Sequence, residues 1–227
     1  MKNRNKFTLI FFFIYSFIIN HSYSSESFNF DVTEIEIKEN GNKFIGKNYG
    51  TATTIDGTTI EAKNFEYNKI KNTLISFGKV KLFDPKNNIT VYSDKVIYFK
   101  NDELIVANGN SRAIGPNFQI DAKNFEYNKL KNLIYAKEKV IIENKKENYL
   151  IFSDEISYFK SDELIFANGN SKAIDNDVEI DANNFKYNKL RSIIYATGNV
   201  KIYNKKEQYL ILSDKITYNK KIGKYIR

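Results

Sequence analysis

One unit of sixty residues recurs along this chain without a gap. Residues 62–69 (AKNFEYNK) return unchanged at 122–129 and as ANNFKYNK at 182–189. The stretch DELIVANGNS at 102–111 returns as DELIFANGNS at 162–171. A repeat of this length predicts that each unit is one small structural element, and that neighbouring elements bury a continuous core between them. The fold must therefore arise by stacking the same element.

Each sixty-residue unit divides into two similar halves. A half-unit reads apolar-x-small-x-x-apolar-x-aromatic, then a polar turn, then apolar-x-small-x-Gly. Half-units begin near residues 30, 60, 91, 120, 151, 180 and 211. The first is degenerate, and the seventh ends before its second arm is complete. We therefore expect seven related hairpins, with the last one leaving an open sheet edge that recruits further strands.

Alternation of period two within each arm predicts strands with one buried face. The set that we interpret as facing inward is Leu74, Ser76, Gly78, Val80 and Leu82. The set that we interpret as facing outward is Thr73, Ile75, Phe77, Lys79 and Lys81. The Asn/Lys-rich segments at 68–72 and 100–102 are typical of hairpin turns.

The alternation slips by one residue between Ala62 and Phe65, and it slips at the same place in later half-units. We interpret the slip as a β-bulge in the first arm, which would bend every strand alike and carry it from one packed sheet into a second. The prediction is an all-β fold: an elongated β-jelly-roll, or two-sheet stack of antiparallel hairpins, with an interior apolar groove. A right-handed parallel β-helix is the alternative.

Large apolar side chains at the inward positions would form the walls of the groove, and small ones would leave room along its axis. Such residues are usually core, but in a groove the core wall is also the ligand wall. The candidate groove residues are Phe65, Tyr67, Leu74, Val80, Val96, Tyr98, Ile105, Phe125, Tyr127, Ile134, Val140, Ile156, Tyr158, Ile165, Phe185, Tyr187, Ile194 and Val200.

Residues 1–24 have the pattern of a secretory signal peptide. A basic start is followed by an apolar stretch at 7–19 and by the small-x-small pattern Ser22-Tyr23-Ser24. The stretch is short for a membrane span, which needs about twenty residues. We therefore predict export, with residues 25–227 forming a single repeat domain. Removing the three basic residues of the signal would lower the formal charge of +8 to +5.

The composition argues against catalysis. The chain has no cysteine, and its one histidine, His21, lies in the predicted signal. The exported chain would lack the usual ligands for zinc, copper and iron and the usual base for a Ser or Cys nucleophile. We therefore expect neither enzymatic activity nor a cofactor or metal.

Three repeated polar motifs have both a chemical and a structural interpretation. The Ser-Asp pairs at 93–94, 153–154 and 213–214 could suggest catalysis, but without a nearby base they are better explained as bulges held by side-chain to backbone hydrogen bonds. The Asp-Glu pairs at 102–103 and 162–163 are better explained as solvated turns than as calcium ligands. Asn-Gly-Asn at 108–110 and 168–170 lies within the alternating register and fits a small-residue strand position better than a turn.

The half-units at 60–80, 120–140 and 180–200 resemble the organic-solvent-tolerance-like (OstA-like) domain family, which forms LptA and the N-terminal part of LptD. The openings FNFDV at 28–32 and NGNKF at 40–44 look most like the N-terminal periplasmic domain of LptD. The resemblance implies a periplasmic jelly-roll, associated with the outer membrane, that shields lipopolysaccharide acyl chains and helps deliver lipopolysaccharide there. It also implies stacking on other Lpt jelly-roll proteins through edge strands.

The chain departs from a full LptD because it carries neither the C-terminal outer-membrane barrel nor the cysteines of some members. We therefore expect a truncated or split LptD or a free-standing LptA-like protein, and a separate outer-membrane barrel is one candidate partner. The basic charge fits either a solvated face or attraction to an anionic partner such as lipid phosphate; nucleic acid is not expected. Two alternatives stay open: an envelope scaffold or adhesin-like β-repeat that binds no lipid, and, least favoured, a two-carboxylate glycosidase.

Overall fold

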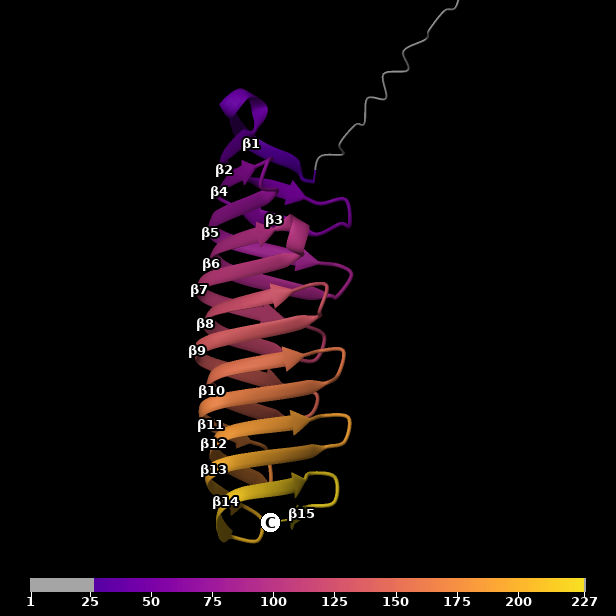
Figure 1. The fold of residues 1–227 in the computed structure, drawn as a ribbon, viewed down its shortest axis with the longest axis vertical. Coiled ribbons are helices and arrows are strands. Elements are labelled where there is room, and N and C mark those ends of the chain that lie inside the picture. Colours follow the sequence, from indigo (N-terminus) through magenta and orange to yellow (C-terminus); the bar gives the residue numbers. More distant parts are fainter. Residues whose placement is uncertain (1–26, 227) are drawn as a thin grey trace, which may run out of the picture.

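The computed structural model describes residues 27–226, which form one elongated stack of strands (Figure 1). The predicted signal peptide lies outside the described residues. The strands are β1 (Asn29–Lys38), β2 (Lys43–Thr53), β3 (Thr59–Ala62), β4 (Asn64–Asn68), β5 (Thr73–Asp84), β6 (Ile89–Phe99), β7 (Leu104–Ile114), β8 (Gln119–Asn128), β9 (Leu133–Asn144), β10 (Tyr149–Phe159), β11 (Leu164–Ile174), β12 (Val178–Asn188), β13 (Ile193–Asn204), β14 (Tyr209–Asn219) and β15 (Lys224–Ile226). Short 3-10 turns occur at η1 (Glu39–Gly41) and η2 (Lys100–Asp102).

These strands form a single sheet in which neighbours in sequence are neighbours in space. β3 and β4 are two halves of one strand that is interrupted at Lys63, whose backbone still bonds to both sides, to Gly78 at 3.1 Å and to Tyr49 at 2.9 Å. Every ladder in the described part of the chain is antiparallel. The predicted stack of hairpins is therefore confirmed, and the parallel β-helix is wrong. The connecting turns are far too short for the crossovers that parallel strands need.

Each long strand bends near its middle, where the register of its ladder shifts. We call the line of these register shifts along the stack the corner. In the β7–β8 ladder, Gly109 and Asn110 together face the single residue Lys123. Both have left-handed backbones, with φ of 82° and 44°, as in a glycine-type bulge. The extra residues therefore lie in the second arm, and the first-arm bulge predicted between Ala62 and Phe65 is wrong. Corresponding left-handed pairs lie at 48–49, 78–79, 138–139, 169–170 and 198–199.

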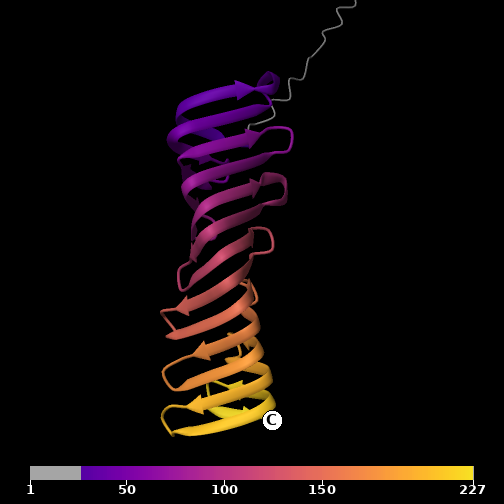
Figure 2. The same ribbon diagram turned by 90° about the vertical axis from the view of Figure 1, so that its left-hand side faces the viewer.

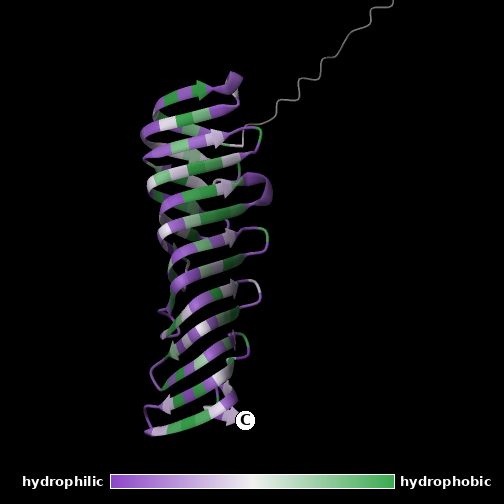
Figure 3. Ribbon diagram, turned by 60° about the vertical axis from the view of Figure 1, so that its left-hand side comes forward, coloured by the Kyte–Doolittle hydropathy of each residue, from purple (hydrophilic) through white to green (hydrophobic). Residues whose placement is uncertain are grey.

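The bends fold the sheet over so that its two halves become facing layers. The strands wrap around on the left of Figure 1, and the same edge seen face-on in Figure 2 shows their direction rotating steadily along the stack. Such a rotation is the ordinary twist of a β-sheet. Apolar and polar residues alternate along each strand (Figure 3). Leu74, Ser76, Val80 and Leu82 are buried while Phe77 and Lys79 are exposed, so the predicted inward register is confirmed except at Gly78, which is half-buried because it lies in a bulge.

Candidate functional site

The eighteen candidate groove residues all face the interior between the two layers. None of them is more than 8% exposed, and they form one continuous cluster that runs the length of the stack. Small side chains such as Ala107, Ala136 and Ala196 are buried among them, as the repeat pattern predicts. The sequence therefore predicts correctly that these residues are buried in the interior.

In this conformation the interior is packed. One apolar cavity near its C-terminal end has a volume of about 20 Å³ and is lined by residues that include Tyr149, Tyr187, Ile194 and Tyr218. A space of that size accommodates about one water molecule and no acyl chain. The role of the eighteen residues as ligand contacts therefore stays a prediction, and an amphiphile would need the two layers to separate.

The layers meet opposite the corner along a line that we call the seam, where two columns of turns face each other. First-column turns connect the two strands of a hairpin, at 39–42, 69–72, 100–103, 129–132, 160–163, 189–192 and 220–223. Second-column turns connect one hairpin to the next, at 54–58, 84–88 (counted with Asp84, the last residue of β5), 115–118, 145–148, 175–177 and 205–208. Among residues 27–226, the backbone bonds of these turns stay within a turn or its own column. Side chains alone therefore hold the seam closed.

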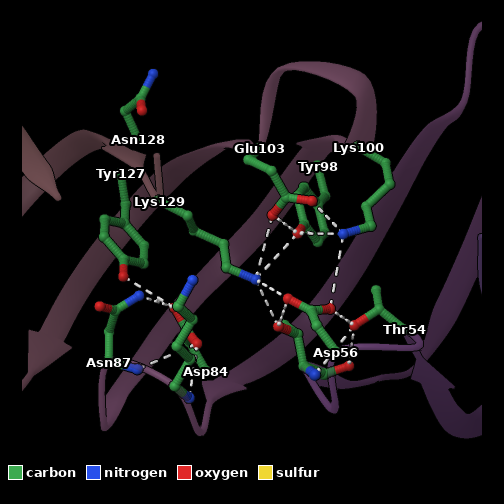
Figure 4. Close-up of polar contacts among 12 residues, drawn as sticks. Thr54, Asp56, Asp84, Asn87, Tyr98, Lys100, Glu103, Tyr127, Asn128 and Lys129 are labelled. Carbon is green, nitrogen blue, oxygen red and sulfur yellow. Dashed lines mark hydrogen bonds and ion pairs between the residues drawn. The ribbon is translucent and has the colours of Figure 1, made fainter. Parts of the chain in front are cut away.

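Lys129 forms the most extensive contact across the seam (Figure 4). Its Nζ lies 2.7 Å from Asp56 Oδ2 and 2.7 Å from the Thr58 hydroxyl, both on the second column. On its own column it lies 3.2 Å from the Tyr98 hydroxyl and 3.3 Å from Glu103 Oε2. The Lys129 side chain is only 5% exposed, so a buried cation links the two layers.

Ion pairs keep the acids of this cluster charged. Burial opposes ionisation of Asp56, but hydrogen bonds from Lys129 and Thr54 outweigh burial and hold the pKa of Asp56 well below its ordinary value. Burial likewise opposes ionisation of Glu103, and Lys100 and Tyr98 outweigh it, so the pKa of Glu103 is lowered. The cluster is thus a set of paired charges at neutral pH.

Similar contacts close the seam further along. The buried Tyr127 hydroxyl donates to Asp84 Oδ2 at 2.9 Å. Lys189 lies 3.7 Å from Glu147, and Lys220 lies 3.2 Å from Asp175. In each case a tyrosine or lysine of the first column or its adjoining strand meets an acid of the second column.

The contact at Phe118 differs from the others because it involves no carboxylate. The Phe118 ring meets Tyr158 edge-on at 5.4 Å, and the Lys160 ammonium lies 5.7 Å from the centre of the same ring. No side-chain hydrogen bond or ion pair of Lys160 is formed within the described residues. Burial lowers the pKa of Lys160, which marks it as a cation without full compensation.

The turn lysines are absent from the inward positions predicted from the sequence, so the seam is not predicted. A signal was available: Tyr-x-Lys occurs at 67–69, 98–100, 127–129, 158–160, 187–189 and 218–220. Because side chains two apart in a strand share a face, a lysine two residues after an inward tyrosine also faces inward. This spacing places the ammonium groups at the rim of the interior rather than outside it.

The repeated Ser-Asp pairs have the structural role predicted for them. Ser93 Oγ bonds to the carbonyls of Lys95 at 3.0 Å and Asn108 at 2.9 Å, and Ser153 repeats this arrangement one unit later. The Asn-Gly-Asn stretches lie within strands, as predicted, but they form the corner. The Asp-Glu pairs are only partly solvated turns: Asp102 is exposed, whereas Glu103 belongs to the seam.

Two further features of residues 27–226 bear on function. A hollow of about 990 Å³ lies on the outer face at the corner, but four of its five charged side chains are paired, Arg112 with Asp121 at 2.5 Å and Lys123 with Glu138 at 2.7 Å. The described side chains form no cluster of three or more metal-binding residues, and no helix in this range is long and apolar enough to cross a bilayer. The interior and its seam are therefore the candidate functional site.

Comparison with protein families agrees with this architecture. Residues 59–164 match the family described as LptA/(LptD N-terminal domain) LPS transport protein. This segment therefore resembles the LptA/LptD N-terminal domain family. The half-units beyond residue 164 repeat those inside the match at an interval of sixty residues, so the same structural unit continues outside the matched segment.

A comparison with solved structures matches LptH of Pseudomonas aeruginosa, the LptA homologous periplasmic component of a lipopolysaccharide transport device. It is 14% identical, with 49% of this chain and 82% of LptH covered and a TM-score of 0.46. The TCP10 domain of Danio rerio CPAP is 12% identical, with 80% of this chain and 99% of that domain covered and a TM-score of 0.18. Both scores are low, so the likeness to this family rests on the match of residues 59–164. No curated protein matches the chain.

Proposed function

We propose that this chain is a periplasmic bridge module that carries lipopolysaccharide toward the outer membrane by shielding its acyl chains between the two layers. The main observation that supports this proposal is the continuous apolar interior. It runs the length of the stack and is closed on one side by side chains alone. The match of residues 59–164 to an LPS transport family supports the choice of cargo. Transport of this kind needs no bond chemistry.

Shielding is the energetic requirement of such transport. Exposing one acyl chain of about twelve carbons to water costs on the order of 10 kcal/mol, at about 0.8 kcal/mol per CH₂. An apolar interior that opens along its seam would accept the chains while the head group stays in water. The corner would act as the hinge, because its ladder continues from layer to layer through each strand.

Photocrosslinking to lipopolysaccharide tests the proposal. A photoreactive residue replaces Val140 or Ala196, which face inward, or Lys79 or Lys201, which are exposed. We expect adducts at the two inward positions and none at the two outward ones. Absence of adducts at all four positions would refute lipid transport. Adducts at the outward positions alone would mean that the lipid binds on the outer surface and not between the two layers.

The packed interior favours a second candidate, an envelope scaffold that binds no lipid. Its core would stay closed, and its ends would join other β-proteins. Within residues 27–226, β15 pairs with only Thr217–Asn219 of β14, and the outer edge of β1 has no partner strand. Both candidates therefore allow edge-strand stacking on other jelly-roll modules. Photocrosslinking separates them, since a scaffold gives no inward adducts.

A further inference from the structure

We infer that Lys129, Lys160 and Lys189 form a binding site for the phosphate groups of an amphiphile's head group, which becomes available when the seam opens. The inference rests on the proposed function and adds a polar site to its apolar interior. It assigns the ligand's anionic part to three turns of the first column.

The three lysines are arranged in a row. They lie on successive first-column turns, and each turn is linked to the next by a backbone bond, from Lys160 N–H to Asn132 at 3.1 Å and from Lys189 N–H to Glu163 at 3.0 Å. Successive turns are two strands apart, which corresponds to about 10 Å at the usual strand spacing of about 4.8 Å. The row therefore follows the rim of the interior, where a head group would sit while its chains lie inside.

The balance of charge differs between the two columns. First-column turns carry ten basic and five acidic residues, whereas second-column turns carry five basic and six acidic residues. When the layers part, the first column keeps its net positive charge and loses its contacts with the acids opposite. An anion entering the open seam would therefore be attracted to the first column.

The three lysines differ in the protein groups that compete with an anion for binding to them. When the seam opens, Lys129 loses Asp56 and Lys189 loses Glu147. Glu103 and Glu163 of their own column stay beside them, so a phosphate would replace one of the two carboxylates at each lysine. Lys160 forms no direct ion pair across the seam, where its contact is the Phe118 ring and the Asp84 carboxylate acts on it only at longer range. Lys160 is therefore the centre of the proposed site, and its substitution breaks no ion pair of the closed form.

The experiment measures the affinity of the full chain for bisphosphorylated lipid A and for the same lipid after enzymatic dephosphorylation. The wild-type chain should prefer the phosphorylated form by tenfold or more, because a hydrogen bond between charged groups is worth about 1.5–3 kcal/mol. Lys160→Gln should reduce that preference about tenfold and leave the affinity for the dephosphorylated form unchanged. Lys160→Arg should restore most of the preference.

Glu147→Gln removes the carboxylate opposite Lys189 and should raise the preference two- to fivefold, an effect opposite to that of a loss of structure. Lys131→Gln is the matched control, since Lys131 is an exposed cation in a neighbouring first-column turn, and it should change the preference less than twofold. Inorganic phosphate at equal concentration should fail to displace the lipid.

Each other result overturns the inference in a recognisable way. Equal affinity of the wild-type chain for both lipids removes the phosphate site but leaves the proposed function intact. Binding of neither lipid refutes the proposed function itself. If Lys160→Gln weakens the binding of both lipids equally, the role of Lys160 is structural. If Lys131→Gln reduces the preference as much as Lys160→Gln does, the effect comes from general surface charge and not from a site. If inorganic phosphate displaces the lipid, the chain does not recognise the head group.

Discussion

The corner and the seam run along opposite edges of the same stack, yet they are held together in different ways. At the corner, each strand passes from one layer into the other, so the layers are joined covalently and by the ladder hydrogen bonds on both sides of every bulge. At the seam, the layers touch through side chains such as Lys129 and Asp56. The corner therefore cannot open without breaking the sheet, whereas the seam can.

The difference also separates two uses of glycine and lysine in the repeat. Gly109 and Gly169 at the corner provide left-handed backbone, which other residues adopt at a cost. The lysines of the seam provide long side chains that reach across a gap. One residue type fixes the bend, and the other holds a closure that can be reversed.

Locking the seam covalently should have the largest effect. Cysteines at Asp56 and Lys100 and at Asp175 and Lys220, whose charged atoms lie 3.6 and 3.2 Å apart, can be joined by a short bifunctional thiol reagent. We expect lipopolysaccharide binding by the joined chain to fall at least tenfold relative to the same variant before joining, because the layers can no longer part. Binding is measured with a fluorescent lipopolysaccharide.

The matched control for this lock is the same reagent across the corner, at Asp94 and Asn110, whose side chains lie 3.0 Å apart. Joining them should leave binding unchanged, since these residues belong to neighbouring strands that never separate. If the protein with the locked seam still binds lipopolysaccharide fully, the acyl chains enter elsewhere, for example through an end of the stack. The difference between the corner and the seam would then have no role in binding.

Alanine at a corner glycine should have the next largest effect, on stability rather than binding. Gly109 has φ of 82°, and an added Cβ would lie 2.6 Å from Asp94 Oδ2. Gly109→Ala should cost about 1–2 kcal/mol of unfolding free energy, because a left-handed backbone is unfavourable for any residue with a Cβ. Urea unfolding measures the loss, and Gly41→Ala is not an adequate control since its φ is also positive.

Gly46→Ala is a better control, because Gly46 lies in β2 without a positive φ. Its added Cβ would meet Val32 at 3.1 Å, a contact that a small shift relieves. Equal losses at Gly46 and Gly109 would mean that crowding, and not backbone conformation, sets the cost at the corner.

The sequence predicts the strands and the buried face well because both depend on a local period of two. The same pattern misplaces the bulge. Inward residues three apart in the first arm, as at Ala62 and Phe65, indicate an extra residue somewhere in the ladder but not on which strand. In the second arm, Ser76 and Val80 are four apart with Gly78 between them, so the alternation looks regular even though the bulge lies there.

The seam is harder to predict because its pairs are remote and do not follow the repeat. Lys129 meets Asp56, 73 residues away, whereas its counterpart Lys189 meets Glu147, 42 residues away. Sheet twist decides which second-column turn faces a given first-column turn, and twist accumulates over many strands. The Tyr-x-Lys spacing indicates that the lysines face inward, but it does not identify their partners.

Acid should weaken the seam. The pKa of Asp56 is lowered in the folded chain, so its contribution to stability is present above its unfolded pKa of about 4 and is lost as the pH falls below that value. Between pH 6 and pH 3, the unfolding free energy of the wild-type chain should fall more than that of Asp56→Asn. The difference should stay below about 1 kcal/mol, since the Asp56 side chain is 37% exposed and its ion pair is screened.

Urea unfolding at the two pH values measures this difference, and the absolute loss is less informative because other carboxylates titrate as well. A larger acid loss in Asp56→Asn than in the wild-type chain would reverse the sign and show that the seam does not depend on this carboxylate.

The smallest effect should come from the one corner bulge that carries no glycine or asparagine. Glu138 and Lys139 occupy it with φ of 67° and 58°, where three other bulges have Gly-Asn. Glu138→Gly relieves the left-handed strain but gives up exposed contacts with Lys123 at 2.7 Å and Asn124 at 2.8 Å. Because exposed ion pairs contribute little, the strain relief should prevail and raise the urea midpoint by a fraction of what Gly109→Ala loses. A lower midpoint would mean that side-chain contacts stabilise this bulge, so that the corner at this position depends on side chains as the seam does.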